Sequence, residues 1–548
     1  MATIITCSSC RRRLEAKDKH AGRTLPCPAC KTPITVPVAA APSQAATPPP
    51  LPPQTGKRES VQQKVGTVQT AAEWMQEKVD LLGDNANGFI LMILAMTEGR
   101  VDVISWLKDN GLDIHIKTKD DEETLMFHAA MGGHVKMMEW LAKQGLSVND
   151  RNVRGQTPLF GCAHMGHVEA MRWLKDMGAD MNARDNRGGT AMHFVVFGEK
   201  AENSTRGLIC LKELGADVDA REEGGQTPIF AAASNGRIDN MKCLKALGAN
   251  INAKDDKGWT PMFFAAAQGQ IESMKCLQDL GADIEAKDND GRTAMCIAVI
   301  LGQIESMKYL KSLGADINAR NNEGIPLLLF ATFHGQIESI RCLKEFGVDI
   351  DTRDNNGWTP IFFAAAQGQI VNMKCLQELG ADVGARSNTG RTPVHAAAEF
   401  GHIEAMWWLK KQGLDVCAKD SDGWTPMRVA IRGGQIESAR WLKEQGADVN
   451  ETDNEGYTLL HAAARGGHIE AMRWLKEQGL KVNARNNDGQ TPVFRAAVGG
   501  HIEAMRWLKD RGADVCVKDN AGRTPMSLAS EGGHSEAVQW LREQGANA

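Results

Sequence analysis

The stretch GWTPMFFAAAQGQI, residues 258–271, recurs almost letter for letter as GWTPIFFAAAQGQI at residues 357–370. The two copies lie 99 residues apart, which is three times a period of 33 that runs through the chain. A Thr marks most periods, with Ile90 and Pro326 where it is lost and a four-residue slip after Thr190: Thr124, Thr157, Thr190, Thr227, Thr260, Thr293, Thr359, Thr392, Thr425, Thr458, Thr491 and Thr524. The sequence therefore contains fourteen repeats that span nearly its whole length.

Each repeat carries the signals of two short helices. In RNVRGQTPLFGCAHMGHVEAMRWLKDMGADMNA, residues 151–183, Gly155 indicates a tight turn, because glycine adopts positive φ without steric cost. Thr157 is predicted to cap the first helix, and the Pro after it suits a first helical position, whose N–H has no helical partner. Gly166 interrupts this helix, and Gly178 is predicted to end the second as a left-handed C-cap residue. An extended Ala-Asp-Met-Asn finger completes the unit.

This order of turn, Thr-Pro, two helices and Gly-Ala-Asp-Val-Asn-Ala resembles the ankyrin repeat over about residues 86–548. The resemblance implies a mainly α fold, an ankyrin-type helix-turn-helix solenoid of about 14 repeats, whose fingers and first helices line a concave surface. Stacking has a physical cause, because one pair of short helices cannot bury its apolar face alone. Residues 67–84 have apolar residues near helical spacing, and we expect them to cap the first repeat.

The repeats depart from the ankyrin pattern in two ways that bear on structure. The His of the family's Thr-Pro-Leu-His occurs only at His193, His395 and His461, so the polar tie between repeats that it implies is questionable at most junctions. The fourth repeat carries GEKAENSTRG, residues 198–207, where the others have a short turn. We interpret this insertion as a longer loop between the two helices, with a dedicated contact loop as the alternative.

Trp, Cys or Tyr stands sixteen residues after most of the marker positions, and the cysteines of this ladder invite a metal or disulfide interpretation. Packed helices lie roughly 8 to 10 Å apart. A disulfide needs Cα atoms within about 7 Å, and thiolates that share a zinc ion all lie about 2.3 Å from it. Core packing is therefore predicted for Cys210, Cys243, Cys276, Cys342 and Cys375.

The first 37 residues have a different pattern. Cys7-Ser-Ser-Cys10 and Cys27-Pro-Ala-Cys30 are separated by sixteen residues, and two Cys-x-x-Cys pairs at such spacing indicate a zinc site. Four thiolates complete a tetrahedral zinc shell, so the metal is structural, and its binding supplies folding energy to a segment with almost no core. Disulfides are the alternative. Residues 1–37 resemble the small β zinc ribbons at the starts of some multi-domain bacterial proteins.

Residues 38–66 read as a Pro-rich linker, because their Ala, Pro, Ser and Gln composition cannot bury a core. The solenoid is then expected over residues 67–548. Residues 1–37 carry a net charge of +5, which allows contact with a phosphate backbone, although the segment has no aromatic residue for base stacking. A solvated basic face is the plainer interpretation of this charge.

Composition and motifs narrow the functional class. No apolar run approaches the roughly 20 residues of a membrane helix, and the first residues lack the apolar stretch of a secretion signal, so a cytoplasmic location is expected. The sequence contains no Gly-x-Ser-x-Gly, no phosphate-binding loop and no His-Glu-x-x-His. With ribbon, linker and repeats accounting for the chain, an enzyme is not expected.

The repeats themselves indicate where a partner would bind. The ankyrin resemblance places the residue before each marker Thr, and the two residues that end the first helix, on the concave side. Trp, Tyr and Arg dominate many protein interfaces and are common at these positions. The candidate partner-binding residues are Trp259, Arg292, Phe333, Trp358, Arg391, Phe400, Trp424, Arg432, Tyr457 and Arg465, beside Ile300 and Leu301. The alternative is that they pack over the turn below.

Charge favours a protein as that partner. The chain carries −5, and subtracting the +5 of residues 1–37 and the +2 of residues 38–66 leaves −12 for the solenoid, which repels nucleic acid. The leading hypothesis is a non-catalytic protein-protein interaction scaffold with structural zinc, without a membrane or small-molecule partner. The alternatives are an adaptor whose zinc ribbon contacts DNA or RNA, and a secreted effector that acts on another cell's proteins.

Overall fold

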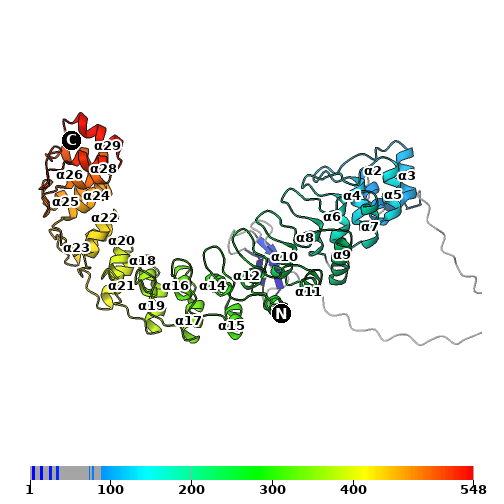
Figure 1. Cartoon of the computed structure of the whole chain (residues 1–548), viewed down its shortest axis with the longest axis horizontal. Coiled ribbons are helices and arrows are strands. Elements are labelled where there is room, and N and C mark those ends of the chain that lie inside the picture. The colour runs from blue at the N-terminus through cyan, green and yellow to red at the C-terminus, as the bar shows by residue number, and fades with distance from the viewer. Residues whose placement is uncertain are drawn as a thin grey trace, which may run out of the picture. The chain divides into compact units, whose positions relative to one another are not determined.

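The computed structural model describes residues 3–6, 13–16, 24–26, 33–35, 73–74, 77–78, 88–198 and 200–546. Contacts within the chain divide it into two units, Met1–Val68 and Gln69–Ala548. Figure 1 shows the second unit as a succession of paired helices. Each unit is described by itself below.

The first unit contains two antiparallel hairpins. Strand β1 (Thr3–Thr6) pairs with β2 (Arg13–Ala16), and Thr3 lies opposite Ala16. Strand β3 (Thr24–Pro26) pairs with β4 (Pro33–Thr35), and Thr24 lies opposite Thr35. The predicted zinc ligands lie outside the described residues, as does the predicted linker 38–66: Cys7, Cys10, Cys27 and Cys30.

The second unit contains 28 described helices, α2 to α29, in consecutive pairs. The first helices of the pairs are α2 (Gly88–Glu98), α4 (Leu125–Met131), α6 (Pro158–Met165), α8 (Ala191–Val195), α10 (Pro228–Ser234), α12 (Pro261–Ala267), α14 (Ala294–Ile300), α16 (Leu327–Phe333), α18 (Pro360–Ala366), α20 (Pro393–Glu399), α22 (Pro426–Arg432), α24 (Leu459–Gly466), α26 (Pro492–Val498) and α28 (Pro525–Glu531). The second helices are α3 (Val101–Asp109), α5 (Val135–Lys143), α7 (Val168–Asp176), α9 (Ala201–Glu213), α11 (Ile238–Ala246), α13 (Ile271–Asp279), α15 (Ile304–Ser312), α17 (Ile337–Glu345), α19 (Ile370–Glu378), α21 (Ile403–Lys411), α23 (Ile436–Glu444), α25 (Ile469–Glu477), α27 (Ile502–Lys509) and α29 (Ser535–Glu543).

Local sequence signals explain the helix boundaries. Thr157 is the N-cap residue of α6 and has an extended backbone, and Pro158 occupies the first helical position. Gly166 ends α6 with φ of 75°, and Gly178 follows α7 with φ of 83°. These left-handed values are strained for residues with a Cβ, so glycine is the residue that fits. The predicted division of the repeat is confirmed.

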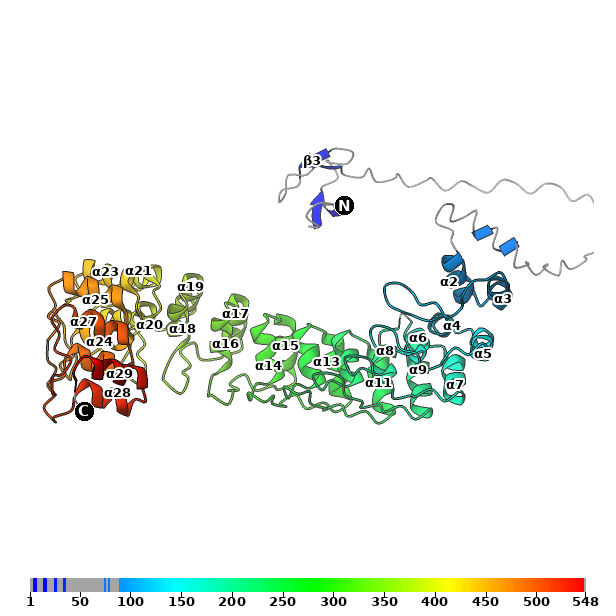
Figure 2. The same cartoon turned by 90° about the horizontal axis from the view of Figure 1, so that it is seen from above.

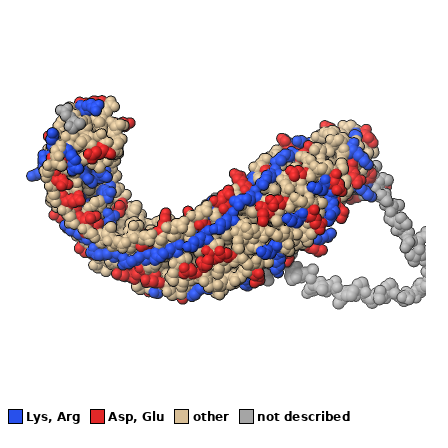
Figure 3. All heavy atoms as spheres, viewed as in Figure 1, with Lys and Arg blue, Asp and Glu red and all other residues tan. Residues whose placement is uncertain are grey.

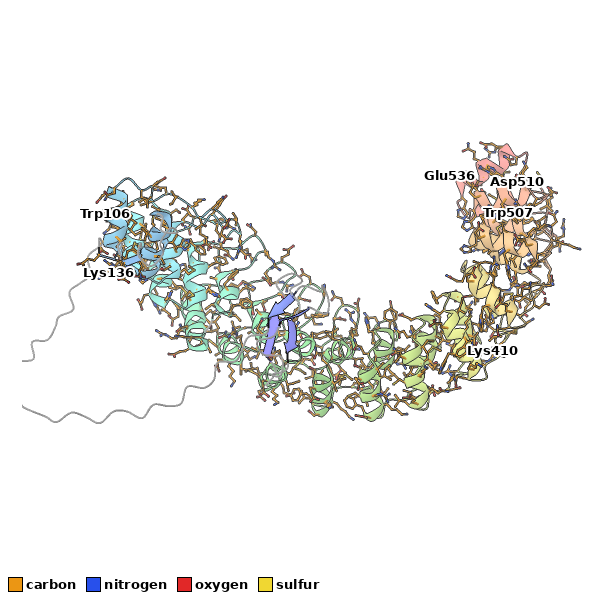
Figure 4. The ribbon with its side chains drawn as sticks, turned by 180° about the vertical axis from the view of Figure 1, so that it is seen from behind. Trp106, Lys136, Lys410, Trp507, Asp510 and Glu536 are labelled. Atoms are coloured by element: carbon orange, nitrogen blue, oxygen red, sulfur yellow. The ribbon has the colours of Figure 1, made fainter. Side chains whose placement is uncertain are left out.

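The pairs stack on one another through a shared core. Each first helix packs against its own second helix and against the first helix of the next pair, as in α24, α25 and α26. Figure 2 shows the pairs following one another along the unit. Over α10 to α24 the first helices lie on the inner, concave side of the curve and the second helices on its outer, convex side (Figure 1). Figure 4 shows Lys410 of α21 at this convex margin.

The insertion in the fourth repeat corrects one expectation. Residues 201–207 form the start of α9, which has 13 residues, whereas α8 has only five. The inserted segment thus lengthens the second helix and is not a longer loop. Ser204 supports this conformation, because its Oγ donates to the carbonyl of Lys200 and lies 3.5 Å from that of Gly198. Gly207 is buried, and a Cβ there would approach Val195 Cγ2 to 2.6 Å.

Trp74 packs at the amino-terminal end of the stack. Its side chain is 2% exposed and joins the hydrophobic core of the first helices. Its indole Nε1 donates to Glu98 Oε2 over 2.6 Å, and Lys78 Nζ lies 2.9 Å from the other carboxylate oxygen of Glu98. Residues 73–74 and 77–78 are helical. This arrangement covers the apolar end that the first pair would otherwise expose.

A ladder of basic side chains joins successive turns. Arg184 Nη1 donates to the carbonyl of Arg221 over 2.6 Å, and Arg221 Nη1 donates to that of Lys254 over 2.9 Å. Equivalent residues continue this basic ladder six residues before most marker positions, with Thr452 as an interruption: Arg151, Arg184, Arg221, Lys254, Lys287, Arg320, Arg353, Arg386, Lys419, Arg485 and Lys518. Figure 3 shows a continuous stripe of Lys and Arg along the solenoid unit. The sequence's net charge gave no sign of this segregation.

The histidine tie is present at the junctions where the sequence has His. Thr392 donates its backbone N–H to His395 Nδ1 over 3.1 Å, and His395 Nε2 lies 3.0 Å from the carbonyl of Trp424 in the next repeat. Burial lowers the pKa of His395 to about 4, so the ring is neutral at pH 7. It can therefore accept at Nδ1 and donate at Nε2. His461 makes the same contacts.

In four repeats Phe replaces this His, and the hydroxyl of the marker Thr is buried without a hydrogen-bond partner among the described residues. Four marker Thr side chains are buried with no hydrogen-bond partner for Oγ1 among the described residues, and each precedes a Phe by three positions. The four pairs are Thr227 with Phe230, Thr260 with Phe263, Thr359 with Phe362, and Thr491 with Phe494. A buried polar group without a partner costs stability, so at this position these junctions have apolar packing in place of the histidine tie.

We expect Thr359→Val to stabilise the solenoid by about 1 kcal/mol, because Val removes an unpaired hydroxyl and keeps its shape. Thr392→Val is the matched control, because Thr392 Oγ1 lies 2.9 Å from His395 Nδ1. Losing that bond should destabilise by about 1 kcal/mol. Urea unfolding of both variants measures the difference. Shifts of the same sign in the two variants would contradict this interpretation.

Candidate partner-binding face

From α14 to α20, three large hydrophobic side chains are exposed at the ends of first helices. Phe333 is the last residue of α16, and Leu301 and Phe400 are the C-cap residues of α14 and α20. Their exposed fractions are 49% for Leu301, 49% for Phe333 and 52% for Phe400. Apolar side chains exposed at the ends of several first helices are the kind of surface that a partner protein covers. We call these three residues the apolar rim.

The turn tryptophans are partly packed. Trp259 is half-buried, its ring lies 5.8 Å from the Phe263 ring, and its Nε1 donates to Asp288 Oδ2 in the next repeat over 3.2 Å. Trp358 is likewise half-buried, with its ring 4.7 Å from that of Phe362. One face of each indole therefore packs on its own repeat, and the rest of the side chain is exposed to solvent. Packing over the turn and partner contact are both consistent with this position.

The turn arginines are engaged in ion pairs. Arg292 Nε lies 2.8 Å from Asp288 Oδ2, and Arg292 Nη2 lies 2.8 Å from Asp290 Oδ2. Arg391 bridges two elements, because it lies 3.2 Å from Glu399 at the end of α20 and 3.2 Å from Asp420 in the following turn. These contacts order the guanidinium groups and neutralise much of their charge.

Tyr457 was expected on the binding surface, and the structure shows that it is buried, with an exposed fraction of 9%. Its Oη donates to Gln490 Oε1 over 3.0 Å, and the Arg495 guanidinium lies 4.7 Å from its ring centre. Gln490 holds the equivalent position in the next repeat, so these side chains reach across the junction to each other. Tyr457 therefore packs across the junction, and the neighbouring repeat covers most of the surface of its ring.

Four arginines surround a cavity of about 250 Å³ beside Tyr457. Arg428 of α22 is buried, lies 3.2 Å from Asp453 and donates to the carbonyl of Tyr457. Arg432, Arg465 and Arg495 line the same cavity from α22, α24 and α26. The guanidinium of Arg432 lies 4.9 Å from the ring centre of Trp424. We call this space the arginine cavity.

Sequence reasoning found two of these arginines and missed two. Arg432 and Arg465 end first helices, where a concave position was expected. Arg428 and Arg495 occupy interior positions of α22 and α26, where the other repeats place uncharged residues, mostly Phe, His or a small or aliphatic residue. An Arg at a position that is uncharged in neighbouring repeats is a signal that could have identified both, because buried charge needs a partner.

The described cysteines offer little nucleophilic chemistry. They are free thiols, and those of the ladder are buried or half-buried, as expected for core packing. Burial raises the pKa of the Cys243 and Cys375 thiols, which keeps them protonated at neutral pH. Within the described ranges, no three His, Cys, Asp or Glu side chains are grouped so as to hold a metal ion.

The family model for ankyrin repeats, which describes three copies, matches this chain many times: over residues 91–185, 239–321, 295–387, 327–420, 363–453, 412–486, 445–519 and 481–548. These matches cover more than half of the sequence, so the chain belongs to the ankyrin repeat family. Residues 186–238, which contain the lengthened α9, fall between the matches. Comparison with curated proteins gives no match.

The family membership sets the general role of the fold. Ankyrin repeats are generally protein-protein interaction modules, and the family is typically non-enzymatic. Among the helices that the structure describes, none is both long and apolar enough to cross a lipid bilayer.

Proposed function

We propose that this protein is a non-catalytic scaffold that binds a protein partner along the concave face of its ankyrin stack. The observation that carries the proposal is the apolar rim, three large side chains about half exposed at the carboxyl-terminal ends of α14, α16 and α20. Trp358 and Trp424, which are half-buried, add aromatic surface to the same side. Aromatic and Arg side chains at the centre of such a face supply most binding energy in protein interfaces.

The cytoplasm is the proposed location, and neither a small-molecule substrate nor a membrane partner belongs to the proposal. The described cysteines are free thiols, which fits a reducing compartment. Burial raises the pKa of the Cys243 thiol, and Asp288 is paired with Arg292, so neither group supports a role as nucleophile or general base.

The experiment that tests the concave face is capture of partners from a nuclease-treated lysate of the parent cell. The bait is the whole chain, compared with a Leu301→Ala, Phe333→Ala, Phe400→Ala variant. The matched control is Val371→Ala, Trp407→Ala, which removes exposed apolar side chains from second helices α19 and α21. Truncating interface anchors costs at least about 2 kcal/mol each, so recovery should fall more than 30-fold in the rim variant only. Equal recovery by the rim variant and the intact chain would refute the proposal.

A structural zinc ion in residues 1–37 is the second element of the proposal. Each Cys-x-x-Cys falls, in sequence, between the two strands of a described hairpin: Cys7 and Cys10 between β1 and β2, Cys27 and Cys30 between β3 and β4. Two hairpins that carry two thiols each match the donor set of a structural zinc site. The metal would supply folding energy, because such a short segment has little core of its own.

Metal analysis checks this element. We expect one zinc ion per purified chain, and Cys7→Ser, Cys10→Ser should lose it, because two thiolates cannot complete a tetrahedral shell. The unfolding transition of the solenoid should not change, since it belongs to a separate unit. Disulfides would show instead as zinc-free protein from which four titratable thiols are missing under denaturing conditions without reductant.

A nucleic-acid-associated adaptor is the second candidate function. The basic ladder favours it, because Lys and Arg in a continuous stripe attract phosphate backbones (Figure 3). The +5 charge of residues 1–37 acts in the same direction. Partner recovery that needs both nucleic acid and intact Cys7 and Cys10 would favour this candidate. A secreted effector would use the same concave face, and partners found only in the lysate of another cell type would favour that role.

A further inference from the structure

The arginine cavity has more positive charge than its own structure neutralises. Among the described residues, no carboxylate lies within ion-pair distance of Arg432, Arg465 or Arg495. Burial and the positive charges of Arg495 and Arg432 lower the pKa of the Arg465 guanidinium. Guanidinium groups that crowd one another without a carboxylate are a cost to the folded chain, which a bound anion relieves.

The other ionisable groups of the cavity do not supply that anion. Asp453 lies 3.2 Å from Arg428, and both side chains are almost fully buried, so this carboxylate is already paired. Arg391 is also close to the Trp424 ring, but it is paired with Glu399 and Asp420. The neutral His461 ring is used at both nitrogens. The remaining acidic residues, Asp422 and Glu455, are exposed residues of the turns that border the cavity.

Size and chemistry define what can enter. A volume of about 250 Å³ is below the roughly 300 to 1,000 Å³ of a typical small-molecule site, so the cavity accommodates a side-chain head group more readily than a whole ligand. Guanidinium groups bind carboxylate and phosphate oxygens in bidentate fashion. The Trp424 and Tyr457 rings hold two of them in place, because cations pack on aromatic faces.

We propose that the arginine cavity binds an anionic side chain of the protein partner, either a phosphorylated residue or a pair of adjacent carboxylates. This inference rests on the proposed function and deepens it. Phe400 of the apolar rim and Arg432 end successive first helices, α20 and α22, which pack against each other. An extended partner segment that covers the rim with apolar side chains would therefore bring its next residues to the cavity. The partner segment should be apolar at one end and acidic or phosphorylated at the other.

The test uses the whole chain and fluorescent ten-residue peptides that are identical except for a central Ser, phosphoserine or Glu-Glu pair. Binding is followed by fluorescence anisotropy at low and physiological salt. We expect the phosphoserine or the Glu-Glu peptide to bind, the Ser peptide to bind at least 10-fold more weakly, and the affinity to fall with salt. The anionic peptide that binds more tightly shows whether the cavity prefers a phosphorylated residue or a pair of adjacent carboxylates.

Variants assign that binding to the cavity. Arg432→Gln, Arg465→Gln should weaken the anionic peptides at least 10-fold. Arg473→Gln is the matched control, because Arg473 lies on the second helix α25 and pairs with Glu470. Equal affinities for all three proteins, or binding of a labelled single-stranded oligonucleotide but of neither anionic peptide, would overturn the inference. Circular dichroism melting confirms that the variants fold.

Cellular capture separates this inference from the function on which it rests. If the apolar-rim variant loses the partner and Arg432→Gln, Arg465→Gln keeps it, the concave scaffold stands and the anion site fails. Loss of the partner from both variants, but not from Arg473→Gln, supports both. Retention by the rim variant refutes the scaffold proposal directly, whatever the peptides show.

Discussion

Replacing Asp453 with Asn should lower the free energy of unfolding by about 3 kcal/mol, because it leaves the Arg428 guanidinium buried without its charged partner. The two side chains are 3% and 5% exposed, and their nearest atoms lie 3.2 Å apart. The turn itself should survive, because Asp453 Oδ1 accepts from the backbone N–H of Tyr457 over 2.8 Å and an Asn Oδ1 can accept the same bond. The loss therefore reports the ion pair.

A second substitution should restore much of that stability. Arg428 holds the position that His occupies in α20 and α24, where the neutral ring reaches the backbone carbonyl of the next repeat. Arg428→His in the Asp453→Asn background removes the unpaired charge and can form the same tie to the carbonyl of Tyr457. Urea unfolding of the single and double variants measures the recovery. A loss below 0.5 kcal/mol for Asp453→Asn would mean that solvent or Glu451 already compensates Arg428.

Trp74→Ala is expected to have the largest effect at the amino-terminal end. Truncating a buried Trp typically costs about 3 to 5 kcal/mol, and here it also removes the donor to Glu98. In a solenoid each repeat contacts only its neighbours, so the damage should be confined to the first pair, α2 and α3. Hydrogen exchange of their backbone amides should accelerate, while exchange in α12 to α26 stays unchanged.

Trp106 provides the matched control for Trp74. It belongs to α3 of the first pair, is labelled in Figure 4 and is equally large, but its exposed fraction is 45%. Trp106→Ala should therefore cost less than about 1 kcal/mol. Equal protection of α2 and α3 in the two variants would show that residues 67–84 do not cap the stack, contrary to the expectation from their apolar spacing.

Much of the fold could be predicted because each repeat encodes its own boundaries. The Thr, Pro and Gly positions set caps and left-handed turns locally, and fourteen appearances of one pattern outweigh the ambiguity of any single segment. The fourth repeat was mispredicted because its Gly and polar residues suggest a loop, whereas the local hydrogen bond of Ser204 to Lys200 and the small, buried Gly207 against Val195 of α8 favour helix. The fit of Gly207 depends on a neighbouring helix, which a local sequence pattern does not show.

The sequence predicted which repeat positions form the candidate site, but not which of their side chains are buried by neighbouring repeats. Phe333, Phe400 and Arg432 are exposed at the ends of first helices, the positions that the repeat pattern assigns to the concave side. Burial of Tyr457 depends on Gln490 and Arg495, which reach it from the next repeat. The basic ladder was missed because a net charge of −12 averages over surfaces that the fold separates. Net charge indicates a partner only when the positions of the charged residues on the folded surface are known.

Oxidative side-chain footprinting of the captured complex tests the central claim, binding along the concave face, most directly. Hydroxyl radicals label exposed side chains, and the free chain offers both faces: Leu301, Phe333 and Phe400 on the concave side, Val371 and Trp407 on the second helices. The account predicts that the partner reduces labelling of Phe333 and Phe400 and leaves Val371 and Trp407 unchanged. Protection of Val371 and Trp407, with Phe333 and Phe400 still labelled as in the free chain, would contradict it.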